Sequence, residues 1–149
     1  MATSGFRPYP GPKADRITVL PEAATQSFKT GDLVIISSGK VAVATDDENV
    51  FGVAMNDASG TTDTDVSVYV IYPGDKFIAE SGAATAVANQ GVAYDINMTS
   101  GSMSVTTGTA ESAVFYIDCL DPRDGAVAAS PYGHVIGRFV YLSIDAIGG

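Results

Sequence analysis

Short apolar runs separated by turn-forming residues fill the chain from about residue 30 onward. The clearest pair is Leu33–Ser37 and Lys40–Ala44, which the dipeptide Ser38-Gly39 joins, and this pattern predicts a tight β-hairpin. The run Asp65–Tyr72 alternates apolar and polar positions before it becomes continuously apolar, which also indicates a strand. Further strands are predicted at Val50–Met55, Asp75–Glu80, Gly91–Ile96, Val105–Thr107, Val114–Leu120 and His134–Ile144.

The segments between these runs contain no long amphipathic pattern. Ser81–Asn89 is rich in alanine and fits either a short helix or a loop, Asp121–Gly125 predicts a turn, and Ala126–Tyr132 predicts a loop. About eight or nine short strands separated by turns indicate a sandwich or a partly closed barrel. The predicted fold class is therefore all-β, with a single β-barrel or β-sandwich domain.

The segment from Met1 to about Phe28 has a different composition, because it holds four of the seven prolines. Proline removes amide donors and biases the preceding residue toward extended geometry, so the run FRPYPGPKADR at residues 6–16 cannot form a helix. A plain linker would be rich in Gly and Ser and would lack aromatic residues. We therefore predict an extended proline-rich N-terminal arm at residues 1–28 and an all-β domain at residues 29–149, with a disordered tail as the alternative for the arm. The candidate partner-interface residues of the arm are Phe6, Arg7, Tyr9, Lys13 and Arg16.

Charge divides the chain in the same way. Residues 1–30 carry four basic and two acidic residues, a charge of +2, whereas residues 31–149 carry four basic and fifteen acidic residues, a charge of −11. The total is −9. Phosphate neutralisation needs clustered Lys and Arg, so the acidic body argues against nucleic-acid binding and against an anionic membrane surface. Acidity that simply keeps the protein soluble explains the charge equally well.

A single cysteine, Cys119, excludes an intrachain disulfide framework and fits folding in a reducing cytosol. Its place in the apolar run Val114–Leu120 predicts a small buried hydrophobic residue. Residues 2–16 lack the apolar core of a signal peptide, and no apolar stretch approaches the roughly 18 residues that a membrane helix needs. The sequence therefore predicts no membrane association.

The residue types that carry most catalysis are scarce. His134 is the sole histidine, and nothing in the sequence pairs it with Cys119 or a particular serine, so a structural or surface role is favoured. One His and one Cys cannot form a usual zinc site. Phosphate-binding loops are absent. The prediction is a protein that is not an enzyme, with no catalytic, cofactor-binding or metal-binding residues and no cofactor.

Two acidic loops remain as candidate cation ligands. Asp46, Asp47 and Glu48 are contiguous, and the next loop holds three more carboxylates. Together they could share a calcium ion, which takes several oxygen ligands. The spacing does not match the EF-hand loop, so solvated surface acids are favoured. The carboxylates of the second loop are Asp57, Asp63 and Asp65.

Several motifs of the body resemble the capsid decoration, or cement, proteins of tailed bacteriophages. In that family a "GD-V" strand start is followed by a turn and a second strand, and the corresponding pieces here are Gly31–Val34 and Lys40–Ala44. The resemblance covers about residues 28–143. The proline-rich arm and the segment around Asp118–Ser130 depart from the family pattern. The other matching pieces are Phe51–Ala54 with Asp57-Ala58, Gly91–Asp95 and Ile136–Leu142.

The resemblance implies a β-barrel or β-tulip-like body that is made in the host cytoplasm and binds the outer capsid surface of the virion. The implied partner is the major capsid protein, and the implied assembly is a homotrimer near local threefold positions. In this interpretation the chain stabilises the shell by bridging capsid subunits. The alternative is a β-sandwich adhesion module on a virion or cell surface that binds glycans, and a hydrolase that uses loop carboxylates is a third, weaker hypothesis.

Overall fold

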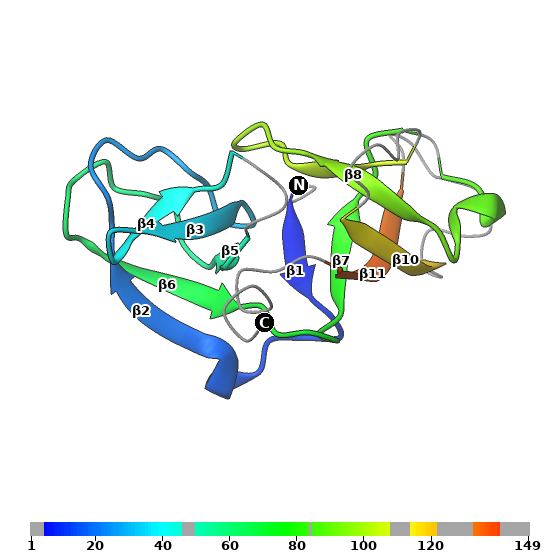
Figure 1. Ribbon diagram of the computed structural model, residues 1–149, viewed down its shortest axis with the longest axis horizontal. Coiled ribbons are helices and arrows are strands. Elements are labelled where there is room, and N and C mark those ends of the chain that lie inside the picture. The colour runs from blue at the N-terminus through cyan, green and yellow to red at the C-terminus, as the bar shows by residue number, and fades with distance from the viewer. Residues whose placement is uncertain (1–4, 46–49, 84, 108–113, 122–132, 141–149) are drawn as a thin grey trace.

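The computed structural model describes residues 5–45, 50–83, 85–107, 114–121 and 133–140, which form two antiparallel β-sheets without an α-helix (Figure 1). The all-β prediction is therefore confirmed. The five-stranded sheet has the order β2-β6-β5-β3-β4. Its strands are β2 (Ile17–Pro21), β3 (Leu33–Ser37), β4 (Lys40–Val43), β5 (Gly52–Ala54) and β6 (Asp65–Val70).

The second sheet has six strands in the order β1-β7-β11-β10-β8-β9, and β1 lies in the middle of the molecule, between the two sheets (Figure 1). Two short 3₁₀ helices, η1 (Ala14–Arg16) and η2 (Val87–Asn89), complete the described elements. The strands of this sheet are β1 (Phe6–Pro8), β7 (Phe77–Glu80), β8 (Ala93–Asn97), β9 (Ser104–Thr106), β10 (Phe115–Leu120) and β11 (His134–Phe139).

The predicted hairpin forms as β3 and β4, with Ser37 opposite Lys40. Ser38 and Gly39 both have positive φ, at 52° and 79°. Two consecutive residues with positive φ form the tight turn whose twist matches that of paired strands, which explains why this dipeptide joins the two strands.

Each sheet curls so that two segments that are not neighbours in the strand order meet at one bridge. In the five-stranded sheet, Glu22 bridges to Val41, and the Ala23 N–H donates to the Val41 carbonyl at 2.9 Å. In the six-stranded sheet, Ser81 bridges to Val105, and the Gly82 N–H donates to the Val105 carbonyl at 2.7 Å. These bridges satisfy backbone groups that an open sheet edge would expose, and the curling gives a partly closed barrel.

The buried apolar residues form two hydrophobic cores, and strands of the five-stranded sheet contribute to both. On β3, Leu33 faces the larger core and Val34 the smaller one, and on β6 Tyr69 and Val68 divide in the same way. Successive side chains of a strand point to opposite faces, so a strand buried on both faces reads as a continuous apolar run. This double burial accounts for the apolar run in Asp65–Tyr72.

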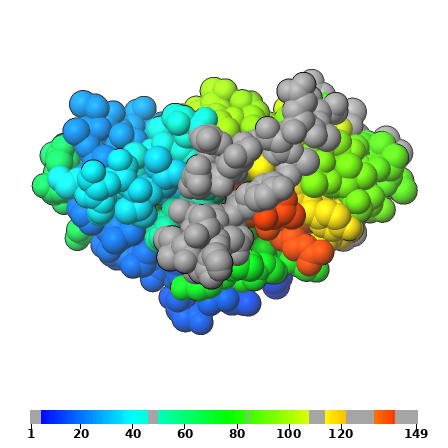
Figure 2. Space-filling model, viewed as in Figure 1, coloured from blue at the N-terminus to red at the C-terminus, as the bar shows by residue number. Residues whose placement is uncertain are grey.

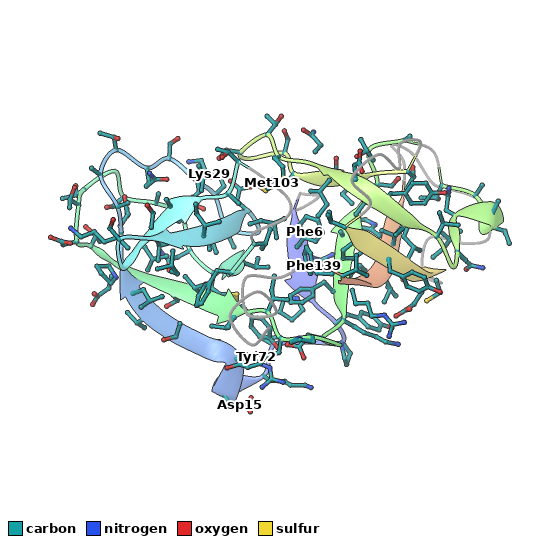
Figure 3. The ribbon with its side chains drawn as sticks, in the orientation of Figure 1. Phe6, Asp15, Lys29, Tyr72, Met103 and Phe139 are labelled. Carbon is teal, nitrogen blue, oxygen red and sulfur yellow. The ribbon has the colours of Figure 1, made fainter. Side chains whose placement is uncertain are left out.

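An aromatic cluster occupies the centre of the larger core (Figure 3). The ring of Phe139 lies 5.3 Å from Phe6, 5.4 Å from Phe77 and 5.2 Å from Phe115. Gly137 lets β10 and β11 approach here, because a Cβ at this position would lie 2.0 Å from the Tyr116 carbonyl oxygen. The cluster joins β1 to β7, β10 and β11.

The predicted boundary between an arm at residues 1–28 and a body at residues 29–149 is wrong. Within the described residues, β1 and β2 are integral strands, because Arg7 pairs with Ile78 of β7 and Thr18 pairs with Val68 of β6. Phe28 is completely buried in the smaller core. The first part of the chain therefore supplies an outer strand to each sheet.

The prolines are compatible with these strands because of their position. The Tyr9 N–H donates to the Lys76 carbonyl of the loop before β7, so by alternation the missing donor of Pro8 would have pointed away from β7. Pro21 ends β2, and the next residue, Glu22, donates its N–H to Thr64. Proline is tolerated in a sheet on such edges and at strand ends.

Most other predicted strands are present, with shifted ends. The strand predicted at Asp75–Glu80 begins at Phe77, and the ambiguous segment Ser81–Asn89 contains η2. The predicted strand His134–Ile144 is described only to Val140, and the turn and loop predicted at 121–132 lie outside the described residues after position 121. Within the described part of the chain, no helix is long and apolar enough to cross a bilayer.

Candidate partner-binding surface

Asp32 fixes the place where the N-terminal segment meets both sheets. It is 2% exposed, and its carboxylate accepts hydrogen bonds from the Lys29 N–H at 3.0 Å, the Ser100 hydroxyl at 2.7 Å and the Gly101 N–H at 2.9 Å. Ser100 and Gly101 belong to the turn between β8 and β9, whereas Asp32 immediately precedes β3. The "GD" motif thus joins the two sheets.

Gly31, the other half of the motif, holds β1 in place. Its carbonyl accepts the Phe6 N–H at 2.9 Å, and its own N–H donates to the Ala54 carbonyl at 2.9 Å. A Cβ on Gly5 would lie 2.4 Å from the Gly31 oxygen, so only glycine permits this approach. The motif therefore has a structural role in positioning β1.

Residues 9–13 cross from one sheet to the other. The Tyr9 N–H bonds the Lys76 carbonyl, and the Lys13 N–H donates to the Tyr69 hydroxyl at 3.3 Å. Beside this crossing lies a groove of about 330 Å³, which has residues 6–12 on one side and Thr30, Gly31, Ala54 and Met55 on the other. The groove has a mainly apolar lining, as is usual for a binding cleft.

Phe6 was a candidate anchor for a partner, and the structure contradicts that assignment. Its ring is 1% exposed and packs against Phe115 and Phe139 in the larger core (Figure 3). A ring enclosed in this way cannot contact another protein while β1 stays paired with β7. Phe6 is therefore a core residue.

Arg16 is also engaged within the chain. Its Nε lies 3.1 Å from Asp75 Oδ2, a second nitrogen lies 3.4 Å from Oδ1, and the guanidinium stacks 4.4 Å above the Tyr72 ring. The hydrogen bond to Asp75 raises the pKa of Arg16 above its usual value. This two-point contact holds η1 against the turn between β6 and β7. Because Asp75 already neutralises the guanidinium of Arg16, Arg16 is a weak candidate for an ion pair with a partner.

The remaining candidates lie on the surface beside the groove. Arg7 and Lys13 are exposed, and neither forms an ion pair with any of the residues that the structure describes. Tyr9 is half-buried and lines the groove. The structure thus brings three of the five predicted residues to one surface, and their contact with a partner stays a prediction.

The apolar residues of β2 were not among the predicted site residues. Ile17 is 39% exposed and Val19 is 55% exposed, and the two side chains share one face of the strand. In Figure 2, atoms of η1 and β2 form the lower margin of the molecule. The alternation of apolar and polar residues in Ile17–Leu20, ahead of a proline, could have indicated this strand. The prolines around the run led instead to its interpretation as part of an arm.

Two of the three carboxylates of the second acidic loop, Asp57 and Asp63, have partners within the chain. Asp57 Oδ1 accepts the Thr30 N–H at 2.8 Å and the Thr30 hydroxyl at 3.0 Å, and Asp63 lies 2.8 Å from Lys40 Nζ. Among the described residues, no group of three or more His, Cys, Asp or Glu could hold a metal ion. The first acidic loop, at 46–49, lies outside the described residues.

Asp57 gives the protein a testable sensitivity to acid. The hydrogen bonds from Thr30 lower the pKa of Asp57 below its usual 3.8. The stability that depends on this shift is present above pH 3.8 and is lost as the pH falls through the lower folded-state pKa. We expect Asp57→Asn to lower Tm at pH 6 and to converge with the parent protein in strong acid, as thermal unfolding monitored by circular dichroism would show. A Tm difference that stays constant with pH would contradict this linkage.

His134 and Cys119 lie near each other in the sheet but make different contacts. His134 begins β11 opposite Glu80, and its carbonyl accepts the Asp121 N–H. Cys119 pairs with Ile136 just after an irregularity in β10. It is half-buried, whereas the sequence predicted a buried residue. The irregularity shifts the alternation of β10, which explains why the apolar run misled the prediction.

Comparisons with known proteins return no match to a protein-family model, to a curated protein or to a solved structure. Evidence on function therefore comes from the residues and surfaces of this chain.

Proposed function

We propose that this chain is a structural protein of a bacteriophage virion, without enzymatic activity, which binds the outer capsid surface and stabilises the shell. The observation that carries the proposal is the surface beside the groove. There an extended, proline-rich backbone presents the cations of Arg7 and Lys13 from a protein whose net charge is −9. Opposite charges across a contact speed association and select the partner.

The motifs that resemble decoration proteins support the same function. Gly31 and Asp32 position β1 beside the groove, so the most recognisable motif of the chain serves the surface on which the proposal depends. The proposed partner is the major capsid protein, and the proposed assembly is a homotrimer on the outside of the virion after synthesis in the host cytoplasm.

A bridging protein would stabilise a capsid for a simple physical reason. Packaged genome loads the seams between capsid subunits, and a clamp across a seam adds buried area that must be separated before the shell opens. Several linked copies raise the effective concentration of each contact, so the assembly holds more tightly than one copy alone.

The proposal is tested with purified empty shells that lack this protein, built from the major capsid protein that co-purifies with it. We expect saturable co-sedimentation and a higher rupture temperature by light scattering. Reversing the charges in Arg7→Glu/Lys13→Glu should weaken binding about tenfold at low salt, because exposed charges act mainly through long-range attraction.

The matched control is Lys40→Glu, which reverses a charge on the β3–β4 hairpin outside the groove lining, and it should bind as the parent does. Shells that neither bind the parent protein nor gain stability from it would refute the proposal. Deletion of residues 1–28, the obvious test of a separate arm, is unsuitable because it removes β1, β2 and the buried Phe6 and Phe28.

A further inference from the structure

The outer side of β2 carries backbone groups that point away from its sheet. The Glu22 N–H donates to the Thr64 carbonyl at 2.8 Å, and this bond sets the alternation along the antiparallel pair. Thr18 and Leu20 therefore direct their backbone groups at β6, and Val19 directs its N–H and carbonyl outward. Because the sheet curls, the C-terminal end of β2 is covered by β4. The bridge to β4 begins only at Glu22, so it does not cover the beginning of β2.

The side chains of the first four residues of β2 leave this edge unprotected, and Pro21 blocks only its end. Ile17 and Val19 are exposed apolar residues, and no charged residue lies within the strand. Sheet edges are normally blocked by lysine, proline or a covering segment. Among the described strands, β1 has Pro8 at the edge and β4 begins with Lys40, which pairs with Asp63. The beginning of β2 lies at the margin of the molecule, and none of the described strands lies beyond it (Figure 1).

The exposed face of β2 runs toward the groove. Val19 lies opposite Ser67 on β6, and the Ser67 carbonyl accepts the N–H of Met55, which lines the groove. Neighbouring strands are about 4.8 Å apart, so Val19 and Met55 are separated by roughly 10 Å along the same face. Val19 and Met55 therefore lie on one face of the sheet, with the partly buried Ser67 between them.

Two cations lie at the end of this surface that is nearest the groove. Arg7 and Lys13 are exposed and have no ion pair among the described residues, whereas the charge of the nearby Arg16 is already matched by Asp75. Unmatched cations beside an apolar strip are complementary to a segment that carries carboxylates among apolar residues.

From these observations we infer that β2 is a docking edge for an extended acidic polypeptide segment, which adds beside it as a further strand. The outward groups of Val19 supply the backbone hydrogen bonds, Ile17 and Val19 contact its apolar side chains, and Arg7 and Lys13 attract its carboxylates. This inference is independent of the proposed capsid function, because the segment is defined by its chemistry and could belong to any partner.

A second copy of β2 is a poor occupant of this edge. Pro21 has no N–H to donate, and the Ile17 N–H already bonds the Ala14 carbonyl of η1. Two β2 strands placed side by side in opposite directions would exchange hydrogen bonds only at Val19. The edge therefore fits a strand of different sequence.

The probe is an acetylated, amidated heptapeptide, Asp-Val-Thr-Val-Thr-Val-Asp, added to the full chain. We expect the exchange rate of the Val19 amide, measured by NMR, to fall at least tenfold at saturating peptide. The amides of Thr18 and Leu20 should change little, because they already bond β6. A peptide with Lys in place of both Asp residues should bind about tenfold more weakly, a loss of about 1.4 kcal/mol.

Two variants with the same substitution distinguish peptide binding at the edge of β2 from binding elsewhere on the surface. Val19→Glu should weaken peptide binding at least tenfold, and Val87→Glu, which alters a 64% exposed valine on η2, should leave it unchanged. Both substitutions are at exposed positions, and circular dichroism checks that the fold is kept. Binding that Val19→Glu does not weaken, or the absence of protection at Val19, would overturn the inference. If protection of the Val19 amide increased with protein concentration in the absence of peptide, the edge would pair with a second copy of the chain. That result would also overturn the inference.

Discussion

Replacing Phe6 with alanine should lower the free energy of unfolding by about 3–5 kcal/mol, the usual cost of removing a buried aromatic ring from a packed core. The ring is 1% exposed and lies within 5.5 Å of the Phe115 ring and 5.3 Å of the Phe139 ring, so its removal leaves a cavity that three strands surround. Chemical denaturation monitored by tyrosine fluorescence or circular dichroism measures the loss. Tm should fall by at least about 6 °C.

The neighbouring residue provides the control. Arg7→Ala changes an exposed side chain on the same three-residue strand, and a surface substitution of this kind should alter stability by no more than about 0.5 kcal/mol. If Phe6→Ala cost no more than Arg7→Ala, β1 would not be docked in the core, and the prediction of a separate arm would regain support. The pair of variants therefore distinguishes a core strand from an attachment arm.

Local sequence signals correctly predict the elements that depend on neighbouring residues. The β3–β4 hairpin follows from an apolar run, the turn residues Ser38 and Gly39 and a second apolar run, all within about a dozen positions. Strands β6 and β10 are also correct, because their apolar side chains are consecutive in the sequence. In each case the strand can be predicted from residues that are close together in the sequence.

The N-terminal segment could not be assigned in this way. Its three-residue strand β1 is too short to show a period, and it is stabilised by contacts of Phe6 with Phe115 and Phe139, more than 100 positions away. The prolines indicate extended geometry correctly, but they cannot show whether the extended chain lies on its own body or on a partner. That choice depends on nonlocal packing.

The candidate surface was predicted in part for the same reason. Charge indicates Arg7 and Lys13, which are exposed beside the groove, but it does not reveal that Asp75 occupies Arg16. The open edge of β2 follows from strand order, since β2 lies next to β6 although some 40 residues separate them in the sequence. Sequence indicates which residues could bind a partner, and topology decides which of them are available.

Substituting Asp32 with alanine should cost about 2–4 kcal/mol, because its carboxylate accepts three hydrogen bonds and bonds to a charged group contribute about 1.5–3 kcal/mol each without being additive. Lys29 and Gly101 would lose the carboxylate to which their N–H groups donate. The turn between β8 and β9 would then be released from the start of β3. Chemical denaturation gives the cost, and hydrogen exchange shows whether the Gly101 amide loses protection.

A double-mutant cycle with Ser100→Ala tests whether Asp32 acts by joining the two sheets. The Ser100 hydroxyl donates to Asp32 at 2.7 Å, so the cost of Ser100→Ala should largely disappear once Asp32 is alanine. The control is Asp57→Ala, which removes an exposed carboxylate that also accepts a backbone N–H, and it should cost much less because water replaces the lost bond. Additive costs for Asp32 and Ser100 would contradict the junction. A large coupling would show that the "GD" motif holds together the two sheets between which β1 and the groove lie.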